Sequence, residues 1–212
     1  VAICMSGELN FDKTINLIDK YFGDWKANSE LLEVKYQEQK KINSPIINEV
    51  LGPDRESVTI GYRFNTKDKK ELMKLKLIDM LLANSTAGLI DLNLVQKQKV
   101  LFANSLIDEM NDYNVHILEG NPKENQSLEE VKDLILGEIK NIKNGKFDDY
   151  LLNAIVNDLK KSTMLQDDSE NANYYRGDKM VLAFTRNQKW RENVTFFDEI
   201  SKITKEDLVS FA

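Results

Sequence analysis

The chain has 212 residues, of which 42% are apolar and 30% are charged, and this is enough to bury one good core or at most two small ones. Its net charge of −6 leaves no surplus of cations to neutralise phosphates, which argues against a nucleic-acid partner. No apolar run approaches the roughly 20 residues of a membrane-spanning helix. Because the chain begins at Val1 in mid-pattern, we expect it to be part of a longer protein.

The first 26 residues predict a short strand followed by a helix. VAICM, residues 1–5, is an apolar run typical of a buried strand. Its Cys4 is the single cysteine of the chain, which excludes an internal disulfide and indicates a packing residue. Asn10 can cap the helix start and Gly23 its end. The helix prediction depends on apolar residues at helical spacing, namely Phe11, Ile15, Ile18 and Phe22.

A polar connector and a half-buried strand follow. Residues 27–48 carry only scattered apolar side chains and include Pro45, as a connector would. ESVTIGYRF, residues 56–64, then alternates between two faces, which predicts a strand with one buried side. The apolar face would hold Val58, Ile60, Tyr62 and Phe64, and the opposite face Thr59, Gly61 and Arg63.

The rest of the chain alternates between helical and strand patterns. Ser127 to Glu130 forms a capping-box sequence before an amphipathic helix that Gly145 would end, and Thr204 to Asp207 would start a last short helix. We therefore predict an α+β fold, with a mainly antiparallel sheet covered by helices on one face. The expected helices are 69–84, 87–98, 127–144, 147–165, 171–184 and 190–200, and the expected strands are 100–110 and 111–120.

The stretch HILEG, residues 116–120, stops one letter short of the H-x-x-E-H zinc signature. That motif needs two histidines one turn apart on a helix, whereas this tract has a strand pattern and Gly120 stands at the second histidine position. His116 is also the only histidine of the chain. We therefore expect an ordinary strand or loop histidine and no zinc or other cofactor bound by this chain.

Other chemical signatures are weak as well. No G-x-S-x-G elbow marks a nucleophile that could work with His116, and the glycines form no phosphate-binding pattern. Arg63 is either a surface arginine or a group that contacts substrate in a cavity. Adjacent carboxylates on a helix diverge, so we interpret the acidic pairs as solvated surface: Asp108/Glu109, Glu129/Glu130, Asp148/Asp149 and Asp167/Asp168.

The order of the elements resembles the C-terminal module of the insulinase/pitrilysin family of zinc metallopeptidases. SGELNFDKTINLIDKYFGDWK, residues 6–26, looks like that family's strand ending in Gly and the helix after it. SVTIGYRF is similar to the next strand, TAGLIDLNLVQKQKVLFANSLI to the turn, helix and strand beyond it, and ITKEDLVSFA to the closing helix. The resemblance runs over nearly all of the chain, and it implies the fold that the strand and helix patterns predict.

The sequence departs from the family at the functional positions. Val95 and Gln96 stand where the family has Arg-Glu, and residues 99–102 replace its Gly-Leu-Ala-Tyr strand. The places of an Arg and a Tyr that reach toward the reaction centre in active members hold Val115 and Gln126. The H-x-x-E-H motif, which the family carries upstream, is absent from the sequence. The resemblance therefore implies a catalytically silent module.

Two functions remain open from the sequence. The resemblance implies either a non-catalytic module that encloses peptide substrates against an H-x-x-E-H module in the same or a partner chain, or a structural module for assembly. By the same resemblance, residues 1–26 belong to the preceding module, 27–48 form a connector and 49–212 form the peptidase-like module. The strand expected at residues 1–5 could then fill the exposed sheet edge of its own chain, or that of a second copy in a domain-swapped homodimer formed through residues 1–26. Thr59 and Arg63 would face the substrate.

Overall fold

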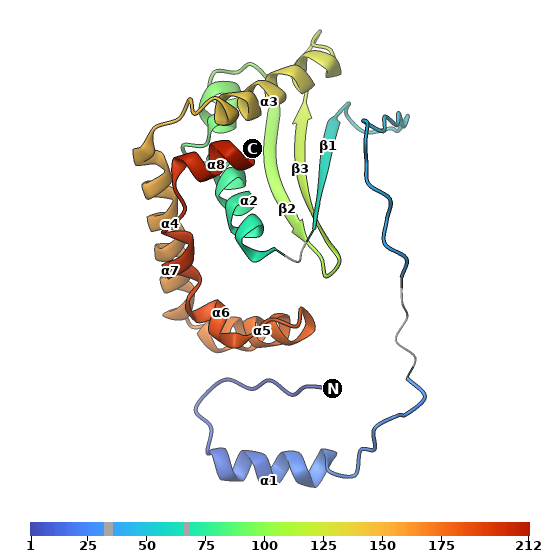
Figure 1. Cartoon of the computed structure of the whole chain (residues 1–212), viewed down its shortest axis with the longest axis vertical. Coiled ribbons are helices and arrows are strands. Elements are labelled where there is room, and N and C mark those ends of the chain that lie inside the picture. Colours follow the sequence, from blue (N-terminus) through green and yellow to red (C-terminus); the bar gives the residue numbers. More distant parts are fainter. Residues whose placement is uncertain (32–35, 66–67) are drawn as a thin grey trace. The chain divides into compact units, whose positions relative to one another are not determined.

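The computed structural model describes residues 1–31, 36–65 and 68–212, and Figure 1 shows its elements. These residues form two compact units, one made of Asp54–Ala212 together with Val1–Cys4, the other of Met5–Pro53. The larger unit contains the sheet, and the smaller contains helix α1. The boundary between the units lies close to the end of the predicted connector, while the assignment of residues 1–26 to a preceding module stays a prediction.

Helix α1 spans Phe11–Phe22 and is capped as predicted. The side chain of Asn10 accepts a hydrogen bond from the backbone N–H of Lys13 at 3.0 Å, and the N–H of Gly23 donates to the carbonyl of Asp19 at 2.8 Å. These bonds satisfy backbone groups at both helix ends. α1 nevertheless contains no buried residue, and Phe11 is 74% exposed, so its apolar stripe is uncovered.

The strand expected at residues 1–5 is not formed, and that part of the prediction is wrong. A strand exists only when its backbone is hydrogen-bonded to a neighbouring strand. The sheet contains β1, β3 and β2, and among the described residues none pairs with residues 1–5 in a ladder. An apolar run has the composition of a strand but does not supply its partner.

The sheet consists of three antiparallel strands in the order β1-β3-β2, which confirms the strand predictions downstream of residue 55. β1 spans Val58–Asn65, β2 spans Phe102–Glu109 and β3 spans Tyr113–Asn121. In register, Leu118 of β3 lies opposite Ile60 of β1 and Ser105 of β2, so these three side chains share a face. β2 and β3 form a hairpin that turns at Asn111 and Asp112.

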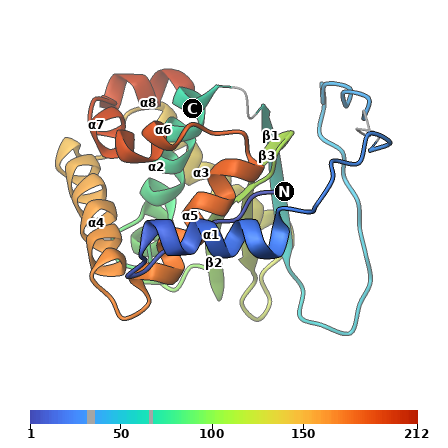
Figure 2. The ribbon, with the colours of Figure 1, turned by 90° about the horizontal axis from the view of Figure 1, so that it is seen from below.

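Helices cover one face of this sheet, as Figures 1 and 2 show for α2 and α3. α2 spans Lys69–Leu82 and α3 spans Leu128–Lys143. α3 lies so close to the sheet that a Cβ atom added at Gly120 would be 2.6 Å from Val131 Cγ1 and 2.8 Å from Ile135 Cδ1. Leu118 beneath the helices is fully buried. The predicted α+β fold is therefore confirmed.

The remaining helices differ from prediction in two places. The helix expected at 87–98 contains a π-helix, in which Gln96 donates to the carbonyl of Asp91, five residues earlier, at 2.8 Å. The single helix expected at 190–200 is broken at Thr195, whose hydroxyl donates to the carbonyl of Arg191. The bounds are η1 Asp91–Val95, α4 Asp149–Asp167, α5 Ala172–Thr185, α6 Trp190–Val194, α7 Phe196–Ile200 and α8 Lys205–Phe211. Over the described ranges, every helix is too short or too polar to cross a membrane.

Both capping boxes predicted from the sequence are present. Ser127 and Glu130 exchange side-chain and backbone hydrogen bonds at the start of α3, and Thr204 and Asp207 do the same at the start of α8. The bonds from the backbone and hydroxyl of Thr204 hold the pKa of the Asp207 carboxyl below its usual value. These caps fix where the helices begin and hence how they cross the sheet.

Glu109, at the end of β2, joins three elements. Its Oε1 lies 2.7 Å from the ammonium of Lys76 on α2, and its Oε2 lies 3.2 Å from the guanidinium of Arg186 at the end of α5. A second guanidinium nitrogen of Arg186 donates to the backbone carbonyl of Glu109 at 3.2 Å. The hairpin end is therefore tied to a sheet-covering helix and to the C-terminal helices at one carboxylate.

Candidate functional site: the open face of the sheet

The face of the sheet opposite α2 and α3 is the candidate functional surface, and we call it the open face. In register, Gly61 of β1, Ile117 of β3 and Leu106 of β2 form its apolar middle row. None of the described side chains on this face is buried. Polar residues lie on either side of the middle row, namely Thr59, Glu119 and Asn104 in one row, and Arg63 and Asp108 flanking Val115 in the other.

Arg63 is held in place on the open face. Its guanidinium lies over the ring of Tyr113 at 4.8 Å from the ring centroid, within the range of a cation–π interaction. The side chain is half-buried, so its position is more restricted than that of a solvated surface arginine. A guanidinium in this position presents N–H donors that match carbonyl and carboxylate oxygens. The structure thus places Arg63 on the face that the alternation predicted.

Thr59 lies on the same face, in line with Glu119 of β3, and is exposed. Thr59 and Arg63 are separated along β1 by Gly61 on this face, where a Cβ atom would have only Val115 within 4 Å. β1 is also an edge strand, because among the described residues its pairing partner is β3 alone. Its outer edge offers backbone donors and acceptors to an extended chain. Contact of Thr59 and Arg63 with substrate stays a prediction.

On the covered face, the structure brings together a serine, a histidine and an aspartate. His116 Nε2 lies 2.8 Å from Ser105 Oγ and 3.4 Å from Asp79 Oδ1, and Ser105 Oγ donates to Asp79 Oδ1 at 2.5 Å. His116 and Ser105 are buried. Because Ser105 donates to Asp79, its oxygen faces His116 as an acceptor, which assigns the proton to Nε2.

This cluster is not a catalytic triad. In a triad, the serine and the aspartate contact opposite nitrogens of the imidazole, so that the histidine can take the serine proton. Here both groups contact Nε2, and the serine donates to the carboxylate. The interpretation of His116 as a strand histidine agrees with this arrangement. One feature of the sequence indicates this cluster, namely the charged Asp79 inside the apolar run LIDMLL of α2.

Metal-ligating side chains do not gather in the part of the chain that the structure describes, where no group of three or more His, Cys, Asp or Glu residues could hold an ion. His116 has one carboxylate neighbour, Asp79. Tyr62, opposite His116 in register, is partly buried on the covered face, and this desolvation raises the pKa of its phenol. These groups stabilise the covered face rather than forming part of the open face.

The architecture defines a class of protein, an α+β module in which helices cover one face of an antiparallel sheet. The family model described as the peptidase M16 inactive domain matches residues 1–159. The chain therefore belongs to this family, and it is a non-catalytic peptidase module. This confirms the resemblance seen in the sequence and the expectation of a catalytically silent chain.

Solved structures show the same fold. A protease from Helicobacter pylori is 18% identical with a TM-score of 0.86, and the match covers 97% of this chain and 50% of that one. The periplasmic protease PqqL from Escherichia coli is 16% identical with a TM-score of 0.72, covering 97% and 22%. An inactive peptidase domain from Bordetella parapertussis is 10% identical with a TM-score of 0.61, covering 76% and 87%.

The chain thus spans only half of the matching Helicobacter protein and less of PqqL. At these identities the likeness describes the fold. A search of curated protein sequences found no match.

Proposed function

We propose that this module forms one wall of a chamber that encloses peptides, with its open face turned toward them. The zinc chemistry would be supplied by a module that carries H-x-x-E-H, in the same chain or in a partner chain. The observation that carries the proposal is the one-sided covering of the sheet, which leaves an apolar middle row between polar rows on the other side. Such a face suits the alternating side chains of an extended peptide.

Arg63 and Thr59 are the side chains that we propose to contact the peptide. Arg63 is positioned by Tyr113, so a bond from its guanidinium to a peptide oxygen costs less ordering than one from a free arginine. A residue that binds substrate and transition state equally affects KM and leaves kcat unchanged. In the full-length protein, Arg63→Ala should therefore raise KM for unfolded peptides several-fold at unchanged kcat.

The control for Arg63→Ala is Lys160→Ala, which removes an exposed cation from α4. This variant should leave KM unchanged, because α4 lies outside the open face. The zinc content should be the same in both variants. An unchanged KM in Arg63→Ala would contradict a role for this side chain in peptide binding.

Deletion of residues 54–212 from the full-length protein tests the wall itself. We expect peptide cleavage to be lost while zinc stays bound, because the proposed wall supplies shape and not ligands. The chain alone should cleave no peptide with or without added zinc. Unchanged turnover after the deletion would favour the alternative function, an assembly module.

We further propose that residues 1–26 dock on a neighbouring module or on a second copy. The support is α1, whose apolar residues are at helical spacing although none is buried. Phe11 and Ile15 remain 74% and 41% exposed. If the partner is a second copy, light scattering should show a dimer that Phe11→Ser with Ile15→Ser dissociates. Leu17→Ser, on the other side of the helix, should leave it intact. A monomer at all concentrations would rule out the homodimer.

A further inference from the structure

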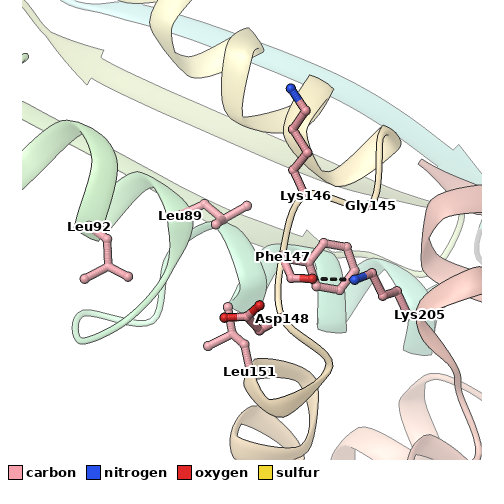
Figure 3. A pocket seen from close by; sticks show the side chains of 8 residues that line it. All are labelled: Leu89, Leu92, Gly145, Lys146, Phe147, Asp148, Leu151 and Lys205. Atoms are coloured by element: carbon pink, nitrogen blue, oxygen red, sulfur yellow. Dashed lines mark hydrogen bonds between the residues drawn. The ribbon is translucent and has the colours of Figure 1, made fainter.

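A shallow cleft lies between the start of the η1 region and the loop that joins α3 to α4, and Figure 3 shows it from close by. Its volume is about 420 Å³. Leu89 and Phe147 are buried in its floor, while Leu92 is 39% exposed and Leu151 is half-buried. None of its described lining residues belongs to the open face of the sheet. The cleft is therefore a separate surface with an apolar interior.

The cation at one end of the cleft is already engaged. Lys205 donates to the carbonyl of Phe147 at 2.5 Å, pairs with the carboxylate of Asp149 at 3.2 Å and lies over the Phe147 ring at 4.8 Å. Figure 3 shows the bond to Phe147, and it shows Lys146 extending away from the cleft. Lys205 therefore already has a carboxylate, a carbonyl and a ring as partners, and these contacts reduce its attraction for an anion in the cleft.

Asp148 is the acidic residue that lines the cleft. Asp148 stands at the N-cap position of α4, where an aspartate normally accepts a bond from the helix backbone, yet its carboxylate makes no capping bond. The residue is exposed. In Figure 3, its oxygens lie beside Leu151 and face the space toward Leu89 and Leu92. The cleft thus combines apolar walls with a carboxylate that makes no capping bond to its own helix.

We propose that this cleft binds a long cationic side chain, arginine or lysine, of a polypeptide partner. The methylene stem would pack against Leu89, Leu92 and Leu151, and the charged end would pair with Asp148. Arginine and lysine are the side chains that combine an apolar stem with a cationic end. Charge complementarity selects this occupant. Of the two lysines that line the cleft, Lys205 is paired and Lys146 extends away from it, whereas the carboxylate of Asp148 faces its interior.

The test is a titration of the whole chain, labelled with ¹⁵N and followed by NMR, with N-acetyl-arginine methylamide. We expect saturable shifts at the amides of Gly145 and Leu151. The citrulline analogue has the same shape without the charge, and it should bind roughly tenfold more weakly, as the loss of a charged hydrogen bond predicts. Shifts that do not saturate, that lie elsewhere, or that are equal for the citrulline analogue would overturn the proposal.

Two substitutions separate the contribution of the Asp148 charge to binding from that of the apolar residues of the cleft. Asp148→Asn should weaken binding of the arginine probe to the level of the citrulline probe, and Leu92→Ser should weaken both probes alike. Asp168→Asn, at the other end of α4, also removes an exposed acid and should change neither. Wild-type affinity in Asp148→Asn, or an equal loss in Asp168→Asn, would show that Asp148 does not recognise the cation.

Discussion

Gly120→Ala tests how closely α3 is packed on the sheet. The added methyl group would lie 2.6 Å from Val131 Cγ1 and 2.8 Å from Ile135 Cδ1, well inside the 3.5–4.0 Å at which carbon atoms attract. Both neighbours are fully buried, so α3 or its side chains must shift. Overpacking of this kind costs about 1–3 kcal/mol. For a chain of this size, that corresponds to a melting temperature lower by about 2–12 °C.

The assay is thermal and urea unfolding of Gly120→Ala beside Gly137→Ala, a matched control on α3. A Cβ atom at Gly137 meets nothing within 4 Å, and alanine is the better helix former by about 1 kcal/mol. The control should therefore stabilise the protein where Gly120→Ala destabilises it. Opposite signs for the same chemical change would show that the close contact with α3, and not the glycine-to-alanine change in itself, decides the outcome at residue 120.

A second substitution identifies the neighbour that causes the clash. Val131→Ala creates room above Gly120, so the double variant should be destabilised by less than the sum of the two single changes. We expect a coupling free energy of about 0.5–3 kcal/mol. Strict additivity, or a Gly120→Ala variant as stable as the wild type, would refute the close approach of α3 to β3.

Three further predictions concern polar groups. Thr204→Ala should cost about 0.5–2 kcal/mol in urea unfolding by removing the side-chain cap of α8. The backbone and hydroxyl of Thr204 also lower the pKa of the Asp207 carboxyl. The hydroxyl's bond to this carboxylate is present at neutral pH and is lost on protonation, so the gap to wild type should narrow below about pH 4. Asp79→Ala should cost about 1–3 kcal/mol in urea unfolding, because it leaves the buried hydroxyl of Ser105 without its acceptor, and Asp79→Asn should recover part of the loss. Tyr62 should ionise above about pH 10, since burial raises its pKa; the absorbance difference between wild type and Tyr62→Phe measures this, and a midpoint at or below 10 would contradict it.

The features that the sequence predicted well depend on neighbouring residues. Asn10 and Ser127 cap helices through bonds to residues three positions away, and such spacing is visible in the sequence. The alternation in β1 predicted which side chains share a face, although Tyr62 on the covered side remains 39% exposed, because β1 is an edge strand. Local rules were sufficient for these elements and for the side on which Arg63 lies.

The features that were missed depend on distant residues. Residues 1–5 have strand composition, but a strand also needs a partner that local patterns do not specify. Asp79 meets Ser105 across 26 positions of sequence, through the packing of α2 on the sheet. Such contacts set the character of a site, and single-sequence patterns do not contain them.

The ion pairs of Glu109 with Lys76 and Arg186 affect which substitutions this chain can accept during evolution. Loss of Lys76 or Arg186 leaves the carboxylate with its other cation, so the loss of stability from either change alone is limited. Loss of the carboxylate instead leaves two positive charges facing one another at the end of the hairpin, which costs more than losing either bond. Substitutions at these three positions should therefore occur in a preferred order. A cation is replaced first, and the glutamate follows only after one of the cations is gone.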